Sequence, residues 1–423
     1  MDAVQLRYGK EMLSCDLPSA EILVPDLPEK GSSAAELVER SLDNPLGCSR
    51  LEEIVQAGEK VAVVASDITR YTGSEHFLPA IVERMGRAGI AETDLQVIIG
   101  LGIHRYQSPQ EHRKILGALY GRVEVIDHQC DNPAELKRLG RTTSGMPVEI
   151  NRRVAQADRV VLTGTIGFHY FAGFGGGRKA LVPGVASRRT CMATHFGVFN
   201  PPEIGGKHPR ATTGVLEGNP VHEAILEGAQ MVQPDFLFNT VLAPDKTIIG
   251  AFSGNLQAAH FAGCDMVRRH FSVPLERAAD LAIVSCGGHP KDINFVQAHK
   301  SLHYAVNALK PGGTVVLLAA CPDGFGHPDF FDWFRYQDLD AFEEALRKDY
   351  QINGQTAHAT LSKARRYRVI LVSSFSAEQT RRMGMEKASG LDRAIEVARA
   401  ELPTDHRTVV IPDGGMVLPF VAG

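Results

Sequence analysis

Three histidines and a lysine stand in glycine-rich or polar segments, where they could carry acid–base chemistry or a covalent attachment. His104 lies in "GLGIHR", His169 opens "HYFAGFGGGRK", Lys179 closes that same string, and His195 ends "ATH". A neutral imidazole can take up a proton near neutral pH, and a lysine amine can act as a counter-ion or as a nucleophile. These four residues are the first candidates for a catalytic or cofactor site.

The glycine run before Lys179 looks like a phosphate-binding loop, but its spacing does not match one. In a nucleoside-triphosphate loop a lysine directly follows the last glycine, and a hydroxyl residue follows the lysine. Here Arg178 separates Gly177 from Lys179, and Ala180 takes the place of the hydroxyl residue. The dinucleotide pattern G-x-G-x-x-G fails as well, because Arg178 stands where its last glycine belongs.

Two interpretations of the run remain open. It is either a turn followed by a solvent-exposed Arg178–Lys179 pair, or a place where glycines, Gly176 and Gly177 among them, let the backbone approach a flat ligand. The aromatic residues in the same string favour the second interpretation.

Other polar segments offer groups that could bind a carboxylate. Asp67 and Arg70 follow an apolar run, and an arginine there can clamp a carboxylate at two points or simply pair with the aspartate. Gln297 and Lys300 are three residues apart, so on a helix they would share one face, turned either to a ligand or to solvent.

Apolar runs that alternate with helical patterns must position these residues. The runs at 60–66, 95–100, 123–127 and 159–164 predict strands, and the spacing over 74–89 predicts a helix between the first two. This βαβ pattern indicates a mainly parallel sheet flanked by helices, with the chemistry in loops after the carboxyl ends of the strands.

The same pattern restarts near residue 279. Its predicted strands are the runs at 280–286, 314–321, 368–375 and 407–412. Its predicted helices cover about 293–309, 338–349 and 390–402.

A chain of 423 residues is long for a single core, so we expect two α/β domains. The N-terminal, cofactor-binding domain would cover 1–272 and the C-terminal domain 275–405, with the active site in the cleft between them. The tail at 406–423 could pack back on the first domain.

Composition and charge narrow the class of protein. A formal net charge of −4 gives no indication of binding to nucleic acid or to a membrane surface, and no apolar stretch is long enough to span a bilayer. The seven cysteines are scattered, which favours reduced thiols over a disulfide framework. Because the N-terminus also lacks the pattern of a signal peptide, we expect a cytoplasmic enzyme.

Taken together, these segments resemble the nickel-dependent lactate racemase family of 2-hydroxyacid racemases and epimerases. The resemblance covers nearly the whole chain and rests on "SDITR", "GIHR", "HYFAGFGGGRK", "ATH" and "KDINFVQAHK". The string that ends at Lys179 is the most specific of these motifs.

The family carries a nickel-pincer nucleotide, a Ni(II) pyridinium-3-thioamide-5-thiocarboxylate mononucleotide. The resemblance implies that this group is attached covalently to Lys179 and that His195 is a ligand of the nickel. It further implies cofactor contacts from the remaining matched positions: Asp67, Arg70, Gly176 and Gly177.

The resemblance also implies roles around the substrate. His104 and His169 would be general acid/base groups, and the substrate would be bound by Arg70, Gln297 and Lys300. The cofactor ring would accept the α-hydrogen as hydride and give a 2-keto acid, which presents its other face before the hydride returns. A proton-transfer group on each side of the substrate explains why there are two histidines.

The expected function is therefore racemisation or epimerisation of a small-molecule 2-hydroxy acid, with the enzymes of cofactor biosynthesis as partners. Val296 stands where the family often has a tyrosine, so lactate, malate, an aryl-lactate and a sugar acid all remain candidate substrates. One competing hypothesis is a zinc-dependent hydrolase that uses His104, His169 and His195. The other is a non-catalytic protein that binds an organic anion.

Overall fold

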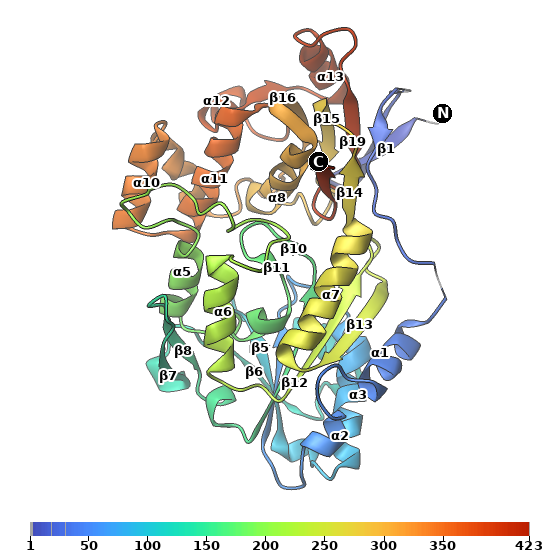
Figure 1. Ribbon diagram of the computed structural model, residues 1–423, viewed down its shortest axis with the longest axis vertical. Coiled ribbons are helices and arrows are strands. Elements are labelled where there is room, and N and C mark those ends of the chain that lie inside the picture. Colours follow the sequence, from blue (N-terminus) through green and yellow to red (C-terminus); the bar gives the residue numbers. More distant parts are fainter. Residues whose placement is uncertain (1–2, 18, 30, 423) are drawn as a thin grey trace. The chain divides into compact units, whose positions relative to one another are not determined.

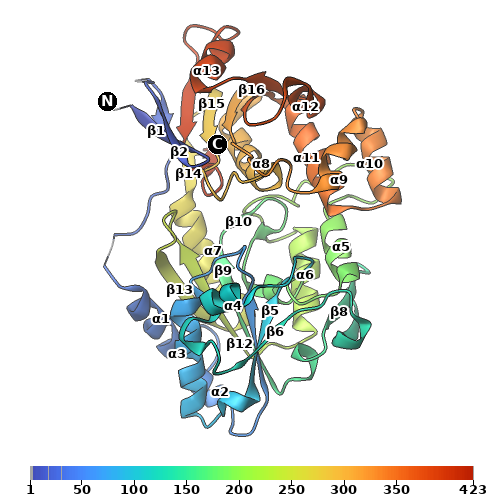
Figure 2. The same ribbon diagram turned by 180° about the vertical axis from the view of Figure 1, so that it is seen from behind.

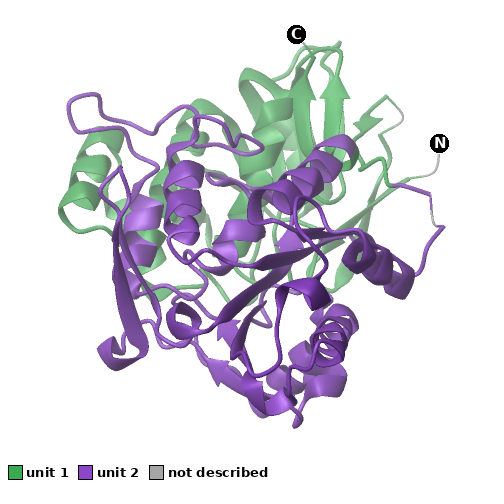
Figure 3. Cartoon of the chain, turned by 60° about the horizontal axis from the view of Figure 1, so that its bottom comes forward, with its two compact units in different colours: residues 1–27, 270–423 green, residues 28–269 purple. Residues whose placement is uncertain are grey.

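The computed structural model describes residues 3–17, 19–29 and 31–422. The protein is mixed α/β, and its chain divides into two compact units (Figure 3): unit 2 is 28–269, and unit 1 combines 1–27 with 270–423.

This division differs from the expected domains of 1–272 and 275–405 at the N-terminal end of the chain. Residues 1–27 belong to unit 1 because β3 (Glu21–Ile22) pairs in parallel with β19 (Thr408–Ile411). In the tail, β20 (Leu418–Val421) pairs with β14 (Ser272–Leu275), and both strands belong to unit 1.

The central sheet of unit 2 contains six strands (Figure 1). They are β4 (Val61–Ser66), β5 (Leu95–Gly100), β6 (Glu124–Asp127), β9 (Arg159–Ile166), β12 (Phe236–Leu242) and β13 (Ile248–Gly254). Their order across the sheet is β13-β12-β9-β4-β5-β6, and every pair is parallel except β12–β13. The four strands predicted from 60–164 are all present.

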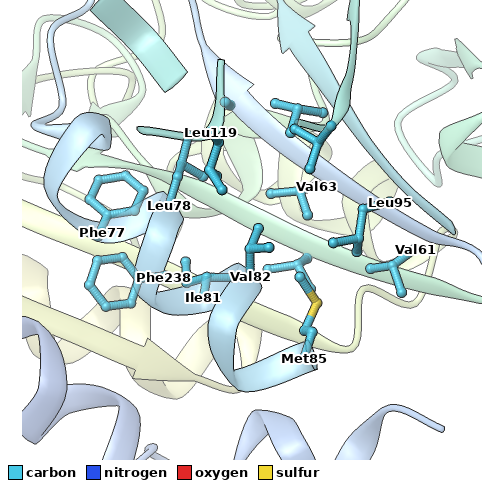
Figure 4. Close-up of a cluster of buried hydrophobic side chains, with 14 of the residues drawn as sticks. Val61, Val63, Phe77, Leu78, Ile81, Val82, Met85, Leu95, Leu119 and Phe238 are labelled. Carbon is cyan, nitrogen blue, oxygen red and sulfur yellow. The ribbon is translucent and has the colours of Figure 1, made fainter. Parts of the chain in front are cut away.

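Helices cover both faces of this sheet, which is why its central strands are almost continuously apolar. Helix α3 (Ser74–Arg87) buries Phe77, Ile81 and Met85 against one face, and the Phe77 ring lies 4.8 Å from that of Phe238 on β12 (Figure 4). On the other face lies α7 (Leu256–Phe271), where Gly263 leaves no room for a side chain beside Ile166.

Further elements of unit 2 surround this core (Figure 2). The helices are α1 (Ala34–Asp43), α2 (Leu51–Ile54), α4 (Pro109–Leu116), α5 (Arg188–Phe196) and α6 (Pro220–Gln230). The antiparallel pairs are β7 (Leu136–Arg141) with β8 (Pro147–Asn151) and β10 (Phe168–His169) with β11 (Gly173–Phe174).

The strand order of unit 2 places a topological switch point at β4. From β4 the chain continues outward through β5 and β6, and it then returns to add β9 on the opposite side of β4. Loops diverge at such a point, and the crevice at the carboxyl ends of the strands is the usual ligand site of an open parallel sheet. The segments after β4, β5 and β9 are those that carry Asp67, His104 and the glycine run.

Unit 1 holds a second six-stranded sheet, in which all pairs are parallel. Besides β3 and β19 it contains β15 (Ala279–Ser285), β16 (Leu309–Leu318), β17 (Arg368–Val372) and β18 (Glu386–Ala388). Its helices are α8 (Phe295–Ala305), α9 (Pro328–Asp332), α10 (Leu339–Lys348), α11 (Ile352–Arg366), α12 (Ala377–Arg382) and α13 (Leu391–Arg399). A hairpin of β1 (Val4–Tyr8) and β2 (Glu11–Cys15) packs with α13 on one face.

All seven cysteines are free. Among the residues with assigned positions, no helix is both long and apolar enough to cross a membrane.

Candidate active site

Five of the predicted site residues come from three neighbouring loops at the carboxyl edge of the unit 2 sheet. Asp67 and Arg70 follow β4, His104 follows β5, and both His169 and Lys179 follow β9. The parallel strand order brings these loops side by side although they are far apart in sequence.

Asp67 is the centre of the first cluster and is only 1% exposed. Its Oδ1 accepts the backbone N–H of Thr69 at 2.7 Å, and its Oδ2 lies 2.9 Å from Nη1 of Arg70 and 3.1 Å from Nδ1 of His104. Burial alone would raise the pKa of Asp67, but the hydrogen bond to His104 and the charge of Arg70 hold that pKa well below its usual range. The carboxylate is therefore ionised and can only accept hydrogen bonds.

An ionised Asp67 determines the tautomer of His104. A carboxylate accepts hydrogen bonds and a guanidinium only donates them, so Nδ1 of His104 cannot satisfy both Asp67 and Arg70, whose Nη1 is also 3.1 Å away. With the proton on Nδ1 and shared with Asp67, Nε2 of a neutral His104 is an unprotonated base. The His104 side chain is 35% exposed, so a ligand can reach that nitrogen.

His169 and Lys179 form the second cluster. The short β10–β11 hairpin presents His169, whose Nδ1 accepts the backbone N–H of Ala172 at 3.3 Å. Nζ of Lys179 lies 3.4 Å from Nε2 of His169 and 5.7 Å from the centre of the Phe171 ring. The predicted base and the predicted attachment point are thus neighbours, ten positions apart in the chain.

His195, on α5, has the properties of a neutral nitrogen ligand. Its Nδ1 donates to the carbonyl of Cys191 at 2.8 Å, which leaves Nε2 as the unprotonated nitrogen. Burial, and then the charge of Lys179, lower the pKa of His195 to about 4, so the ring stays neutral at physiological pH. Its ring lies 5.1 Å from that of Phe171, which also contacts Lys179.

Side chains from other parts of unit 2 pack tightly against the glycine run. Gly177 donates its N–H to Oδ1 of Asn239 at 2.7 Å, a side chain at Gly176 would collide with the same Asn239, and one at Gly177 would collide with the His260 ring. Close internal packing therefore requires these two glycines, while a contact between their backbone and a ligand stays a prediction.

The solvent-exposed Arg178–Lys179 pair considered above is wrong for Arg178. Its side chain is only 1% exposed, and it donates from Nη2 to the Ala172 carbonyl at 2.8 Å. The cause lies in the short 3-10 turn Gly177–Ala180, in which successive side chains point in different directions, so that Arg178 faces inward while Lys179 remains half-buried.

The two remaining predicted residues, Gln297 and Lys300, belong to α8 of unit 1 and are described within that unit. They share a helix face as expected, and Nζ of Lys300 donates to Oε1 of Gln297 at 2.9 Å. The helix is capped by Asn294, whose side chain accepts the N–H of Gln297. Asp292, just before this helix, is fully buried and accepts the N–H of Gly9 at 2.7 Å.

Two buried asparagines that support the site were not singled out from the sequence. Asn239 reaches the glycine run from β12, and Asn219 holds the Phe171 carbonyl at 2.9 Å while it caps α6. The Asn-Pro pair at 219–220 signals a helix start, but nothing local indicates the contact with Phe171.

The three histidines do not form a common metal site. Across the described ranges there is no group of three or more His, Cys, Asp or Glu side chains arranged to hold a metal ion. This geometry does not favour the zinc hydrolase hypothesis.

Two family models match the chain. Residues 8–205 match the lactate racemase N-terminal domain, and residues 275–418 match the lactate racemase C-terminal domain.

Two curated relatives are lactate racemases. The protein of Thermoanaerobacterium thermosaccharolyticum is 31% identical over 430 residues, which cover 99% of both chains. The protein of Lactiplantibacillus plantarum is 34% identical over 433 residues, which cover 98% of this chain and 99% of the relative.

Two solved structures are also similar. The lactate racemase apoprotein from T. thermosaccharolyticum has a TM-score of 0.88, with 99% of each chain covered. A Thermotoga maritima protein with 18% identity and a TM-score of 0.68 shares the fold, with 92% of this chain and 98% of that one covered. The chain belongs to the lactate racemase family and is an isomerase of the racemase class.

Proposed function

We propose that this enzyme racemises or epimerises a 2-hydroxy acid with the aid of a nickel-pincer nucleotide attached to Lys179. The observation that carries the proposal is the 3.4 Å distance between Nζ of Lys179 and Nε2 of His169, because it places an attachment point beside a proton-transfer group. The curated relatives named lactate racemase support the same reaction class.

The residues around Lys179 fit such a group. His195 offers an unprotonated imidazole nitrogen, a donor type that suits nickel, and its pKa of about 4 keeps that nitrogen available at neutral pH. The buried ring of Phe171 lies beside both Lys179 and His195, so the proposed attachment point and the proposed nickel ligand share one apolar neighbour. When bound, the nucleotide would supply a reversible acceptor for the α-hydrogen.

His104 acts as the base on one side of the substrate. Its Nε2 takes the hydroxyl proton, and the buried carboxylate of Asp67 stabilises the imidazolium that forms. Arg70, whose side chain is 58% exposed while it is paired with Asp67, has further N–H groups to offer to the substrate carboxylate.

His169 serves the opposite side of the substrate. Two proton-transfer groups are needed because racemisation gives the product a hydroxyl proton from the face opposite to the one that lost it. Nδ1 of His169 is held by the Ala172 amide, so the ring exchanges a proton through Nε2, the atom next to Lys179.

Gln297 and Lys300 are proposed to bind the substrate through its polar groups, as the family resemblance implies. Val296 precedes Gln297 where a tyrosine is common in the family, so the substrate side chain meets an aliphatic group at this position. The proposal therefore covers 2-hydroxy acids as a class, lactate included.

The decisive experiment is a chiral assay over a panel of 2-hydroxy acids, with protein produced beside the enzymes that make the cofactor. We expect at least one pure enantiomer to become a mixture, and intact mass to show an adduct that Lys179→Ala lacks. Lys114→Ala, which changes an exposed lysine on α4, is the matched control and should keep both adduct and activity. Full activity in Lys179→Ala would refute the proposal.

A further inference from the structure

We propose that Arg178 is a positioning residue, which holds from inside unit 2 the loop that presents His169 and Lys179. This inference rests on the proposed function, since it assigns Arg178 to the proton-transfer machinery described above. Arg178 has an unusual environment: among the residues that the structure describes, it is the largest side chain with less than 2% exposure.

The guanidinium of Arg178 is buried without a carboxylate. None of the ion pairs in the described part of the chain includes it, and its Nε has no hydrogen-bond partner. Burial of an unpaired cation is costly, and here it lowers the pKa of Arg178 to about 10. If the residue only filled space, leucine or methionine would do so without the free-energy cost of burying a charge. The guanidinium must therefore make contacts that an apolar side chain cannot make.

The contacts of Arg178 show what the fork does. Nη2 donates to the Ala172 carbonyl at 2.8 Å, and Nη1 lies 3.5 Å from the Gly176 carbonyl. Nη1 also lies 2.9 Å from Nε2 of His260, a nitrogen that lies 3.0 Å from the Gly175 carbonyl as well. In the neutral ring this nitrogen either accepts from Arg178 or donates to Gly175. One side chain thus joins two positions of the glycine run to α7, beneath the surface that Lys179 shares with His169.

The contact with Ala172 connects Arg178 to His169. The N–H of Ala172 is the donor to Nδ1 of His169, and the carbonyl of the same peptide, that of Phe171, is held by the buried Asn219. Asn219 and Arg178 therefore fix the backbone on both sides of the Ala172 Cα. A fixed amide at this point determines where the His169 ring sits and which of its nitrogens meets a ligand.

The direction of Lys179 depends on the same anchor. Successive side chains in a 3-10 turn lie about 120° apart, so turning Arg178 into the interior turns Lys179 away from it. His260 completes the arrangement, since its ring fills the space that a side chain at Gly177 would need. His260 stays neutral because burial, and then the charge of Arg178, lower its pKa well below the ordinary value.

Arginine is required here because of its shape. A lysine at 178 would keep the charge but could reach only one of the two carbonyls, while methionine would fill similar space without any donor. Arg268 provides a matched control, because its guanidinium lies 4.9 Å from the Phe174 ring of the same loop, yet it is 42% exposed and donates to Gly214, not to Ala172.

The test compares Arg178→Met, Arg178→Lys and Arg268→Met in cofactor-loaded enzyme. For both Arg178 variants we expect kcat to fall roughly 10- to 100-fold with KM changed less than about threefold, because a misplaced base affects the transition state more than binding. Arg268→Met should keep the wild-type kcat. An unchanged kcat in Arg178→Met, or full rescue by Arg178→Lys, would overturn the proposal.

A second measurement does not depend on turnover or on loading. In apoprotein labelled with ¹⁵N-histidine, the ring signals of His169, identified by their loss in His169→Gln, should move in Arg178→Lys and stay in place in Arg268→Met. If no 2-hydroxy acid is turned over by the loaded wild type, the proposed function fails while this measurement still decides the role of Arg178. Unmoved His169 signals in a folded Arg178→Lys protein would refute that role, even if Arg178→Met does not fold.

Discussion

Nδ1 of His104 and Oδ2 of Asp67 lie 3.1 Å apart, in a pair whose carboxylate is buried and ionised. The pair sets the histidine tautomer before any substrate arrives, so that the exposed nitrogen is the basic one. A second histidine–carboxylate pair of similar geometry, His112 and Asp127 at 2.8 Å, lies on α4 and β6 and provides a control for the first.

Asp67→Asn should lower kcat by roughly 10²- to 10⁴-fold, because an amide enforces the His104 tautomer poorly and cannot stabilise the imidazolium. The fold should survive, since the two side chains are nearly isosteric. Steady-state kinetics and thermal unfolding of Asp67→Asn and Asp127→Asn would check this. Equal losses of kcat in the two variants would show that the effect is structural.

His195→Ala should lose nickel, while His104→Ala should retain it and lose racemisation. The physical reason is that the His195 ring lies beside Phe171, which is also next to Lys179, the proposed attachment point, whereas His104 is paired with the carboxylate of Asp67. Metal analysis of purified, loaded protein measures both outcomes. Loss of nickel in His104→Ala would contradict the assignment of ligand and base.

His222→Gln should make the stability of the protein less sensitive to acid. Burial, and then the charge of Arg178, lower the pKa of His222 from 6.5 to about 3, so as the pH falls the unfolded chain takes up the proton first. His222 thus contributes stability that is complete above about pH 6.5 and is lost as the pH falls toward 3.

The variant should flatten the pH dependence of the free energy of unfolding by up to about 1.4 kcal/mol per pH unit between roughly pH 6 and 4. Urea titrations at several pH values would measure this slope. His76→Gln, at a 53% exposed side chain on α3, serves as the control. Parallel curves for wild type and His222→Gln would disprove the linkage.

Lys300→Met should raise KM by at least roughly tenfold and change kcat less, because it removes a cation proposed to bind the substrate carboxylate in ground and transition state alike. Lys310→Met, at a 55% exposed lysine of unit 1 that pairs with Asp280, should leave KM unchanged. Initial rates over a range of substrate concentrations separate the two parameters. An unaltered KM in Lys300→Met would remove this residue from the site.

The core strands could be predicted from the sequence because they are continuous apolar runs, which is the pattern that a buried parallel strand requires. β4 matches the predicted run at 60–66, and β5 matches the predicted run at 95–100. The β1–β2 and β7–β8 hairpins were missed, because β1, β2 and β7 are mostly exposed or half-buried and none of the four strands has a continuous apolar run. The pairing of β3 with β19 could not be read locally at all, since it joins segments from the two ends of the chain.

The placement of Asp67, His104 and the glycine run was also predictable, because each follows a recognisable strand, while their chemical roles stay predictions. What could not be predicted were the buried side chains that hold these loops in place. Arg178 reads as a surface cation beside Lys179, and only the three-dimensional packing reveals that it is buried against Ala172 and His260. Asn219 and Asn239 act on the loop from elements far along the chain, where local pattern carries no information about the contact.

The pairing of β3 with β19 has a consequence for how the chain matures on the ribosome. The strands of the unit 2 sheet all lie between residues 61 and 254, so this sheet can form early in synthesis. The sheet of unit 1 can be completed only late in synthesis, since β3 is made among the first strands and its partner β19 among the last. The nascent enzyme therefore passes through a stage in which the loops of His104, His169 and Lys179 are already in place, while the helix that carries Gln297 and Lys300 still belongs to an unfinished unit.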